Sequence, residues 1–413
     1  MLNKRIVITG IGVISPIGIG KDKYWQSLFE GKSGIKPITL FDVSGLKVRT
    51  GGEISNFNPK EILGDSNLRT LDRATLLLAS STKLAIDDAK LEINKENNRQ
   101  IGVSVGTTFG SLNSISEFDK ASVTDGPRYV NPSVFPNTVF NSPASQLSIR
   151  FHIKGFNTTI SSGMCAGLDA IDYARDFLYR GRAKTIICGA VEEFCIQTFL
   201  GFYKLNYLAG LKNNSEPVSC PFDKRRNGIV FSEGATTLML ESLDDASFRK
   251  TKIYTEILGI GSYFDPYRLT KYNPEGKGMK QAMHLALKDA GLSPQDIGCV
   301  FANANSTQDA DKFETQAVKD VFGSYADKIP IVAVKSMLGE TFSTGGGLAV
   351  IAAIGGINNG FIPPTINYKK KDLGLDLDYV PNKARKFNIN TAMVNTFGQN
   401  GWNKSLIIGR RKK

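Results

Sequence analysis

A cysteine between a strand-like and a helix-like segment is the residue best suited to covalent chemistry. Residues 157–171 read NTTISSGMCAGLDAI, a β-branched run followed by small residues, Cys165 and the start of a helix at Ala166. A cysteine at the amino-terminal end of a helix lies at the positive end of the helix dipole, which lowers the pKa of a thiol. Backbone N–H groups at that position can also stabilise an oxyanion. We therefore expect an exposed nucleophile, although the local pattern fits a buried structural cysteine equally well.

Other residue types used in covalent catalysis or metal binding are scarce. The chain has five cysteines and two histidines. The odd number and wide spacing of the cysteines argue against a disulfide framework, and no spacing typical of a zinc site occurs. We predict no metal and, because dinucleotide and phosphate-loop motifs are missing from the sequence, no cofactor. His152 and His284 lie outside every motif, and we expect both to be non-catalytic.

The composition is that of an ordinary globular protein, with 41% hydrophobic and 22% charged residues. Lys and Arg number 51 against 39 Asp and Glu, a formal net charge of +12. The basic residues are scattered, which indicates a solvated surface and no nucleic-acid site, but they would also suit an acidic macromolecular partner. The most apolar stretch, residues 345–357, is too short for a membrane span, and the N-terminus is typical of a strand. We expect a cytoplasmic protein.

Strand-like and helix-like runs alternate along the chain, which predicts an α/β fold with helices on the sheet faces. The helix-like runs are residues 24–30, 72–89, 166–180, 278–290, 311–322 and 345–358. Three segments recur in the same order: VITGIG as EILGIG, LAIDDAKL as LALKDAGL, and IGVSVGT as IGCVFAN. We therefore expect two similar halves, residues 1–247 and 248–413, that pack together because neither covers its own sheet.

The order of motifs over nearly the whole chain resembles the type II β-ketoacyl-[acyl-carrier-protein] synthases of the thiolase-like superfamily. The segments that carry the resemblance are RIVITGIGVISPIG, NTTISSGMCAG, PFDKRRNGIVFSEGA, KSMLGE and NTFGQNGWN. The resemblance implies a duplicated α-β-α-β-α layered fold, usually dimeric, that acts on acyl thioesters held by acyl carrier protein. Carrier protein is acidic, which suits the positive net charge. The strand NTTISSGM is the one by which such proteins pair across a two-fold axis.

The resemblance also shows where this chain departs from the family. The family uses Cys-His-His, and Cys165 matches the nucleophile. The family pattern AHGTSTPxxDxxE is ANANSTQDADKFE in this chain, so Asn303 replaces the first histidine. The family pattern KSxxGH is KSMLGE, so Glu340 replaces the second histidine, and Lys335 is retained. Asn can donate an N–H but is no general acid or base, and an ionised Glu340 would repel a malonyl carboxylate. We therefore expect decarboxylative condensation to be nearly abolished.

The remaining site residues follow from the same resemblance. Expected at the substrate pocket and its gate are Phe109, Phe397, Gln399, Asn400 and Trp402. Asp311 and Glu314 are expected to support the loop of the first lost histidine. Arg69 and Lys204 are candidates for contact with the carrier protein, since Asn206 stands where a docking Arg is common.

These residues leave three hypotheses open. The first is an acyltransferase of a type II fatty-acid or polyketide pathway that loads Cys165 and either uses a non-malonyl acceptor or condenses with Glu340 as base. The second is a non-condensing partner, like a chain-length factor, in a heterodimer with a competent ketosynthase. The third is ordinary fatty-acid elongation, for which Asn303 and Glu340 are poorly suited. A homodimer or such a heterodimer is expected.

Overall fold

One large sheet runs through the computed structural model, which describes residues 4–212 and 215–411. The sheet has eleven strands in the order β11-β10-β14-β15-β9-β1-β8-β7-β5-β6, and β2 pairs with β1. In chain order they are β1 (Ile6–Ser15), β2 (Gly18–Ile19), β5 (Ile101–Gly106), β6 (Asn157–Ile160), β7 (Thr185–Glu192), β8 (Gly234–Ser242), β9 (Thr255–Phe264), β10 (Cys299–Phe301), β11 (Ile331–Val332), β14 (Thr391–Phe397) and β15 (Trp402–Gly409). Two small sheets pair β3 (Lys36–Pro37) with β4 (Thr50–Gly51) and β12 (Phe361–Ile362) with β13 (Arg385–Lys386).

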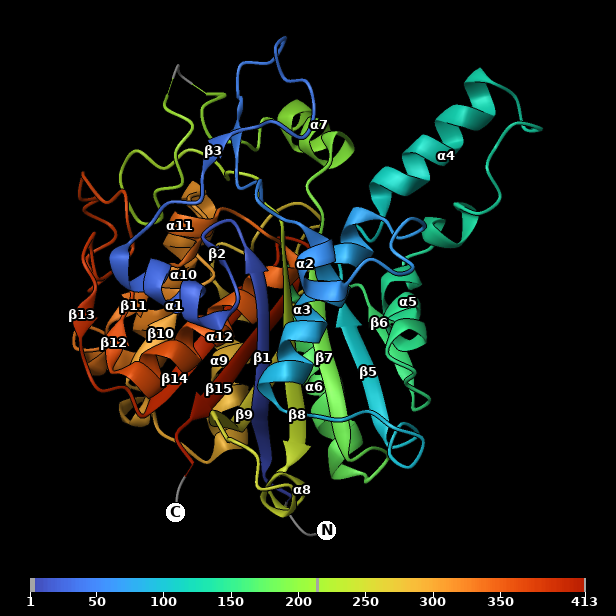
Figure 1. Cartoon of the computed structure of the whole chain (residues 1–413). Helices are drawn as coiled ribbons and strands as arrows, with labels where there is room; N and C mark the ends of the chain where they lie inside the picture. The colour runs from blue at the N-terminus through green and yellow to red at the C-terminus, as the bar shows by residue number, and fades with distance from the viewer. Residues whose placement is uncertain (1–3, 213–214, 412–413) are drawn as a thin grey trace.

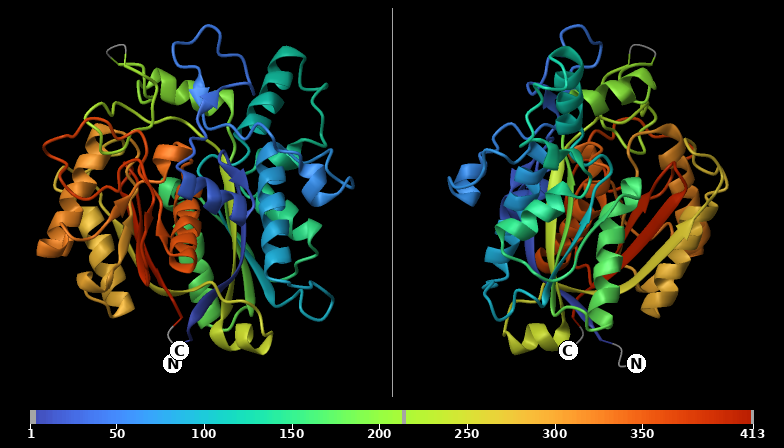
Figure 2. Two further views of the ribbon diagram at one scale, coloured as in Figure 1. Left: turned by 60° about the vertical axis from the view of Figure 1, so that its left-hand side comes forward. Right: turned by 90° about the vertical axis from the view of Figure 1, so that its right-hand side faces the viewer.

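Helices cover both faces of this sheet. They are α1 (Lys21–Glu30), α2 (Pro59–Leu63), α3 (Arg73–Asp88), α4 (Leu112–Thr124), α5 (Ser142–Arg150), α6 (Ala166–Tyr179), α7 (Ile196–Lys204), α8 (Leu243–Phe248), α9 (Lys277–Ala290), α10 (Gln308–Phe322), α11 (Lys335–Leu338) and α12 (Ser343–Asn359). Helices α6 and α12 pack on each other and contact strands of both halves of the sheet, whereas α3 covers β1 and β8 and α9 covers β9 and β15 (Figures 1 and 2). These layers confirm the predicted α-β-α-β-α fold.

The repeated segments of the sequence become neighbouring strands. VITGIG lies in β1 and EILGIG in β9, and the two strands pair antiparallel at Ile6 and Ile257. A Cβ atom at Gly12 would lie 1.7 Å from the Ser81 carbonyl oxygen of α3, and one at Gly261 would lie 2.0 Å from the Ala282 carbonyl oxygen of α9. Each repeat therefore keeps a glycine because its helix lies directly against the strand backbone.

The predicted helices are present, with ends that differ by up to three residues. Six further helices were not expected from the sequence: the longer α4, α5 and α7 and the short α2, α8 and α11. Helix α4 has no buried residue, and it projects from the body of the molecule (Figure 1). His284 on α9 is exposed, as expected. Among the described residues, no helix is long and apolar enough to cross a membrane, and no group of side chains is arranged to hold a metal ion.

Candidate active site

Cys165 lies at the corner between the edge strand β6 and the central helix α6. Gly163 adopts a φ of 66°, a left-handed conformation that turns the chain into the short 3-10 helix Gly163–Cys165, and α6 begins at the next residue. The position at the helix start is therefore as expected, but the thiol is buried, with 1% of the residue exposed. Its Sγ lies 3.2 Å from the Thr396 carbonyl oxygen and 3.4 Å from that of Trp402.

This environment stabilises the neutral thiol. Burial raises the pKa of Cys165 to about 12, and the nearby Asp169 carboxylate acts in the same direction. Hydrogen bonding to Thr396 and the positive charges of Lys404 and Lys335 act in the opposite direction and do not outweigh burial. The expectation of an exposed thiol with a lowered pKa is wrong for this structure, because desolvation of the sulfur decides the sign of the shift.

The three other residues of the expected catalytic set meet in one buried cluster. Lys335 at the start of α11 places its Nζ 2.9 Å from Glu340 Oε2 and 3.0 Å from Asn303 Oδ1. All three residues are buried. Glu340 also accepts hydrogen bonds from Asn305 Nδ2 at 3.1 Å and from the Phe342 backbone N–H at 2.9 Å. The carboxylate is thus paired with the ammonium group and has donors at both oxygens.

Asn303 faces both this cluster and the end of β14. Its Oδ1 is taken by Lys335, and its Nδ2 donates to the Phe397 carbonyl oxygen at 3.1 Å. Thr396, the residue before Phe397, supplies the carbonyl next to Cys165 Sγ. Two consecutive carbonyl groups at the end of β14 therefore connect the thiol and the Asn303 side chain, which are far apart in the sequence.

Asp311 and Glu314 on α10 hold the loop that carries Asn303. Glu314 accepts from the Asn303 and Ala304 backbone N–H groups at 2.9 and 2.8 Å, and Asp311 Oδ1 accepts from the Asn305 N–H at 2.9 Å. Burial raises the pKa of Glu314 to about 7 and that of Asp311 to about 6. This geometry is that of a structural support.

The residues expected at the pocket and gate do not form one group. Phe397 is fully buried, and Asn400 packs beside Gly163 next to the nucleophile corner. Phe109 packs against Phe342 with ring centroids 5.1 Å apart, in a cluster of phenylalanines. Trp402 is 37% exposed, with its ring on Phe264 and beside a separate hollow along α6, while only its carbonyl oxygen approaches Cys165.

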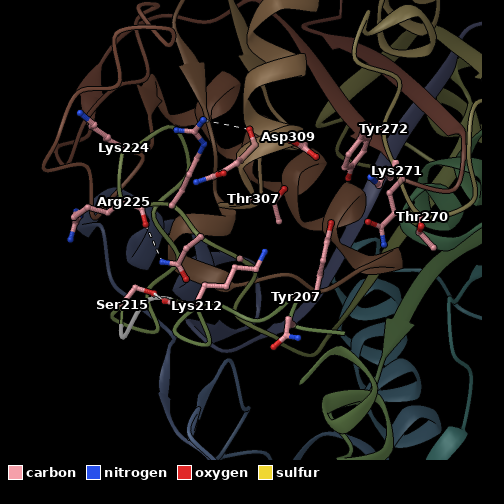
Figure 3. Close-up of a pocket in the computed structure, with 16 residues that line it drawn as sticks. Tyr207, Lys212, Ser215, Lys224, Arg225, Thr270, Lys271, Tyr272, Thr307 and Asp309 are labelled. Atoms are coloured by element: carbon pink, nitrogen blue, oxygen red, sulfur yellow. Dashed lines mark hydrogen bonds between the residues drawn. The ribbon is translucent and has the colours of Figure 1, made fainter. Parts of the chain in front are cut away.

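A surface cavity of about 500 Å³ has Thr307 and Tyr272 on its wall (Figure 3), and both residues contact groups of the buried site. We call it the entrance cavity; its lining residues include the basic side chains Lys212, Lys224, Arg225, Arg226 and Lys271, with Gln399, Thr307 and Tyr272. Thr307 Oγ1 donates to Asn305 Oδ1 at 2.8 Å, and Tyr272 Oη donates to the Phe397 carbonyl oxygen at 3.1 Å. Two hydrogen-bonded paths therefore connect the cavity wall to the buried site.

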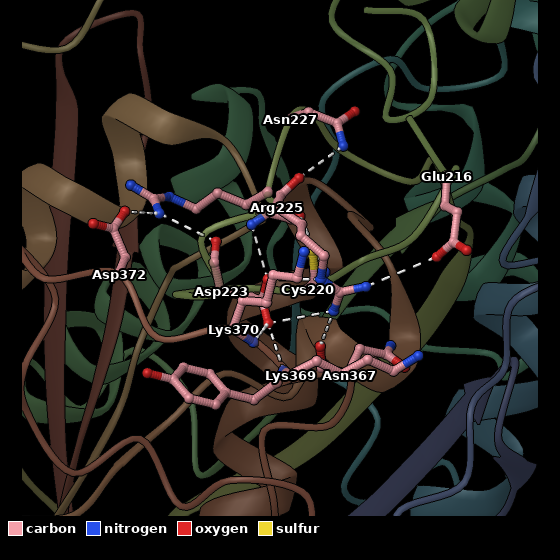
Figure 4. Close-up of polar contacts among 12 residues, drawn as sticks. Glu216, Cys220, Asp223, Arg225, Asn227, Asn367, Lys369, Lys370 and Asp372 are labelled. Atoms are coloured by element: carbon pink, nitrogen blue, oxygen red, sulfur yellow. Dashed lines mark hydrogen bonds and ion pairs between the residues drawn. The ribbon is translucent and has the colours of Figure 1, made fainter. Parts of the chain in front are cut away.

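Polar contacts fix the basic wall of this cavity. Asp223 accepts from Arg225 Nε at 2.9 Å and from the Lys370 backbone N–H at 2.6 Å, and Arg226 donates to Asp372 at 2.6 Å (Figure 4). Side-chain hydrogen bonding to Arg225 and backbone hydrogen bonds act against burial and lower the pKa of Asp223. Arg225 is thus held by a carboxylate two residues away, and Arg226 by one that lies 146 residues further along the chain.

Sequence analysis missed three residues that contact the buried cluster or the Phe397 carbonyl group. Asn305, Thr307 and Tyr272 were not selected. Asn305 was detectable, because it is a second departure of ANANSTQDADKFE from the family pattern. The proposed carrier-contact residues Arg69 and Lys204 are both exposed, and neither lines the entrance cavity.

The layered fold with a cysteine at the start of a central helix defines the class of thiolase-like condensing enzymes. The family model for the beta-ketoacyl synthase N-terminal domain matches residues 3–246, and that for the C-terminal domain matches residues 254–369. The chain therefore belongs to the beta-ketoacyl synthase family, a family of acyltransferases.

Individual relatives agree with this membership. The chain is 36% identical over 411 residues to 3-oxoacyl-[acyl-carrier-protein] synthase 2 of Coxiella burnetii, with 99% of each chain covered. Among solved structures, it is similar to the ishigamide ketosynthase/chain length factor, with a TM-score of 0.93, 33% identity and coverage of 99% and 100%. It is also similar to a ketosynthase in complex with a type II polyketide synthase acyl-carrier protein, with a TM-score of 0.89, 29% identity and the same coverage.

Proposed function

We propose that this protein is an acyltransferase that loads an acyl group from acyl carrier protein onto Cys165 and passes it to an acceptor without decarboxylating a malonyl group. The observation that carries the proposal is the buried Lys335–Glu340 ion pair, in the place of a family histidine and in the same site as a retained cysteine. Among the described residues, Lys335 is the cation that contacts Asn303, and Glu340 already neutralises it. A malonyl carboxylate would enter without a free positive partner and beside a second carboxylate, which is unfavourable in a buried site.

The loading step needs only groups that the site retains. Cys165 Sγ would attack the thioester carbonyl carbon, the new S–C bond would form, and the carrier thiol would leave with the proton that Cys165 gives up. Because burial raises the pKa of this thiol, loading should be slow at neutral pH and faster as pH rises. Asn303 can donate an N–H but cannot move a proton, so it suits orientation of a carbonyl group.

Acyl carrier protein is the proposed donor. The basic side chains around the entrance cavity suit an acidic carrier and an anionic phosphate group on its arm. The similar ketosynthase solved with its acyl-carrier protein supports the same partner. The pathway of this proposal is type II fatty-acid or polyketide synthesis.

A second function, that of a non-condensing partner in a ketosynthase heterodimer, is favoured by one observation. The buried Cys165 thiol is held neutral, which is unusual for a working nucleophile. The similarity to a ketosynthase/chain length factor structure supports this alternative.

Intact-mass analysis separates the two functions. The protein is incubated with acyl-carrier thioesters of several chain lengths, with and without malonyl-carrier protein. We expect acylation of the wild-type chain, loss of the adduct in Cys165→Ala, and no β-ketoacyl product. Cys188→Ala is the control, since Cys188 is also buried but lies in β7 within the hydrophobic core. Acylation that persists in Cys165→Ala, or no adduct with any thioester, would refute the acyltransferase; rapid condensation would refute the assigned role of Glu340.

A further inference from the structure

Tyr272 lines the entrance cavity and also reaches the residue next to the buried cysteine. It follows β9 in a loop and is buried, with one side lining the cavity beside Thr307 and Gln399. Its hydroxyl group lies 4.0 Å from Sδ of Met164, the residue before Cys165. The side chain therefore lies between the cavity that it lines, where Figure 3 shows it, and the residue next to Cys165.

A hydrogen bond holds the ring in this position. Tyr272 Oη donates to the Phe397 carbonyl oxygen at 3.1 Å, and the same oxygen accepts from Asn303 Nδ2 at 3.1 Å. Burial, together with the negative charges nearby, raises the pKa of Tyr272 well above its usual value, so the hydroxyl remains a neutral donor. The phenol thus joins the cavity wall to the carbonyl that also positions Asn303.

We propose that Tyr272 is a specificity-determining residue: its ring closes the inner end of the entrance cavity, and a long thioester arm reaches Cys165 only when the hydroxyl leaves the Phe397 carbonyl. This inference rests on the proposed function, in which thioesters approach Cys165 through this cavity. A bulky arm must displace the ring, whereas a small molecule needs less space. Loss of one neutral hydrogen bond corresponds to about a fivefold change in the population of the open form.

Two alkylating reagents with the same reactive group test the proposal without requiring acyl transfer. Iodoacetamide is the small probe, and N-iodoacetyl aminopantetheine is the same group on an arm of pantetheine length. In each case the sulfur of Cys165 displaces iodide, and the rate at Cys165 is followed by intact mass. We expect Tyr272→Phe to raise the rate with the long reagent about fivefold and Tyr272→Ala to raise it further. The rate with iodoacetamide should change less than twofold.

The controls separate access from other effects. Tyr267→Phe changes an exposed tyrosine of the same loop and should leave both rates unchanged. An equal change with both reagents would overturn the proposal, because Tyr272 would then act on the reactivity of the thiol. No change with either reagent in the folded Tyr272→Phe variant would also overturn it. If the Tyr272 variants raise the alkylation rate with the long reagent but no thioester acylates Cys165, the proposed function fails and the role of Tyr272 stands. If thioesters acylate Cys165 but the alkylation rates do not change, the role of Tyr272 fails and the proposed function stands.

Discussion

Removal of the Lys335 ammonium group should destabilise the protein strongly. In Lys335→Met, Glu340 would remain buried with hydrogen bonds from Asn305 and Phe342 but without a cation. Breaking a buried ion pair from one side costs about 3–5 kcal/mol, because the remaining charge has lost its partner. Since Lys335 is 4% exposed and Glu340 1%, water cannot replace that partner, and we expect a cost in this range.

The double variant Lys335→Met with Glu340→Gln gives the matching expectation. Neither charge remains, and a glutamine side-chain oxygen can still accept from the Phe342 N–H. We expect the double variant to be more stable than Lys335→Met alone, with a coupling free energy of about 2–3 kcal/mol between the two sites. Urea unfolding followed by tryptophan fluorescence measures each free energy. A loss of less than about 1 kcal/mol in the free energy of unfolding of Lys335→Met would refute the reasoning that Lys335 and Glu340 form an ion pair without access to water. Additive effects of the two substitutions would refute it as well.

Three further predictions follow from the site and the fold. Asn303→His with Glu340→His should raise decarboxylation of a small malonyl thioester at least tenfold, about 1.4 kcal/mol off the barrier, and each single change should do less; no gain in a folded double variant would contradict this. Burial raises the pKa of Glu193 from its usual 4.5 to about 8. Protonation of Glu193 therefore stabilises the folded state at low pH, and this stabilisation is lost as the pH rises from 4.5 through 8. The melting temperature of Glu193→Gln should therefore fall less between pH 5 and 8 than that of the wild type. Melting temperatures of the two proteins that change in parallel with pH would contradict this prediction. In the edge strand β6, Thr159→Pro should weaken the expected dimer in light scattering by removing a backbone donor; a wild-type monomer at micromolar concentration would exclude that dimer.

Local sequence patterns were sufficient for the α/β class, and the family resemblance added the layered arrangement. Alternating strand-like and helix-like runs indicated the α/β class, and the repeated glycine segments proved to lie in the paired strands β1 and β9. The β-branched run before Cys165 and the small residues around it also located the cysteine at the start of α6. These features depend on neighbours along the chain, so the sequence alone determined them.

Only the tertiary structure decided the environment of the site. The sequence placed Cys165 at a helix start, where the dipole lowers the pKa of a thiol, but residues of β14 and β15 bury the sulfur and reverse the sign of the shift. The contacts of Asn303 and Tyr272 with one carbonyl group of Phe397 were not expected from the sequence. Desolvation and hydrogen bonding depend on which distant segments pack together, and no local pattern contains that information.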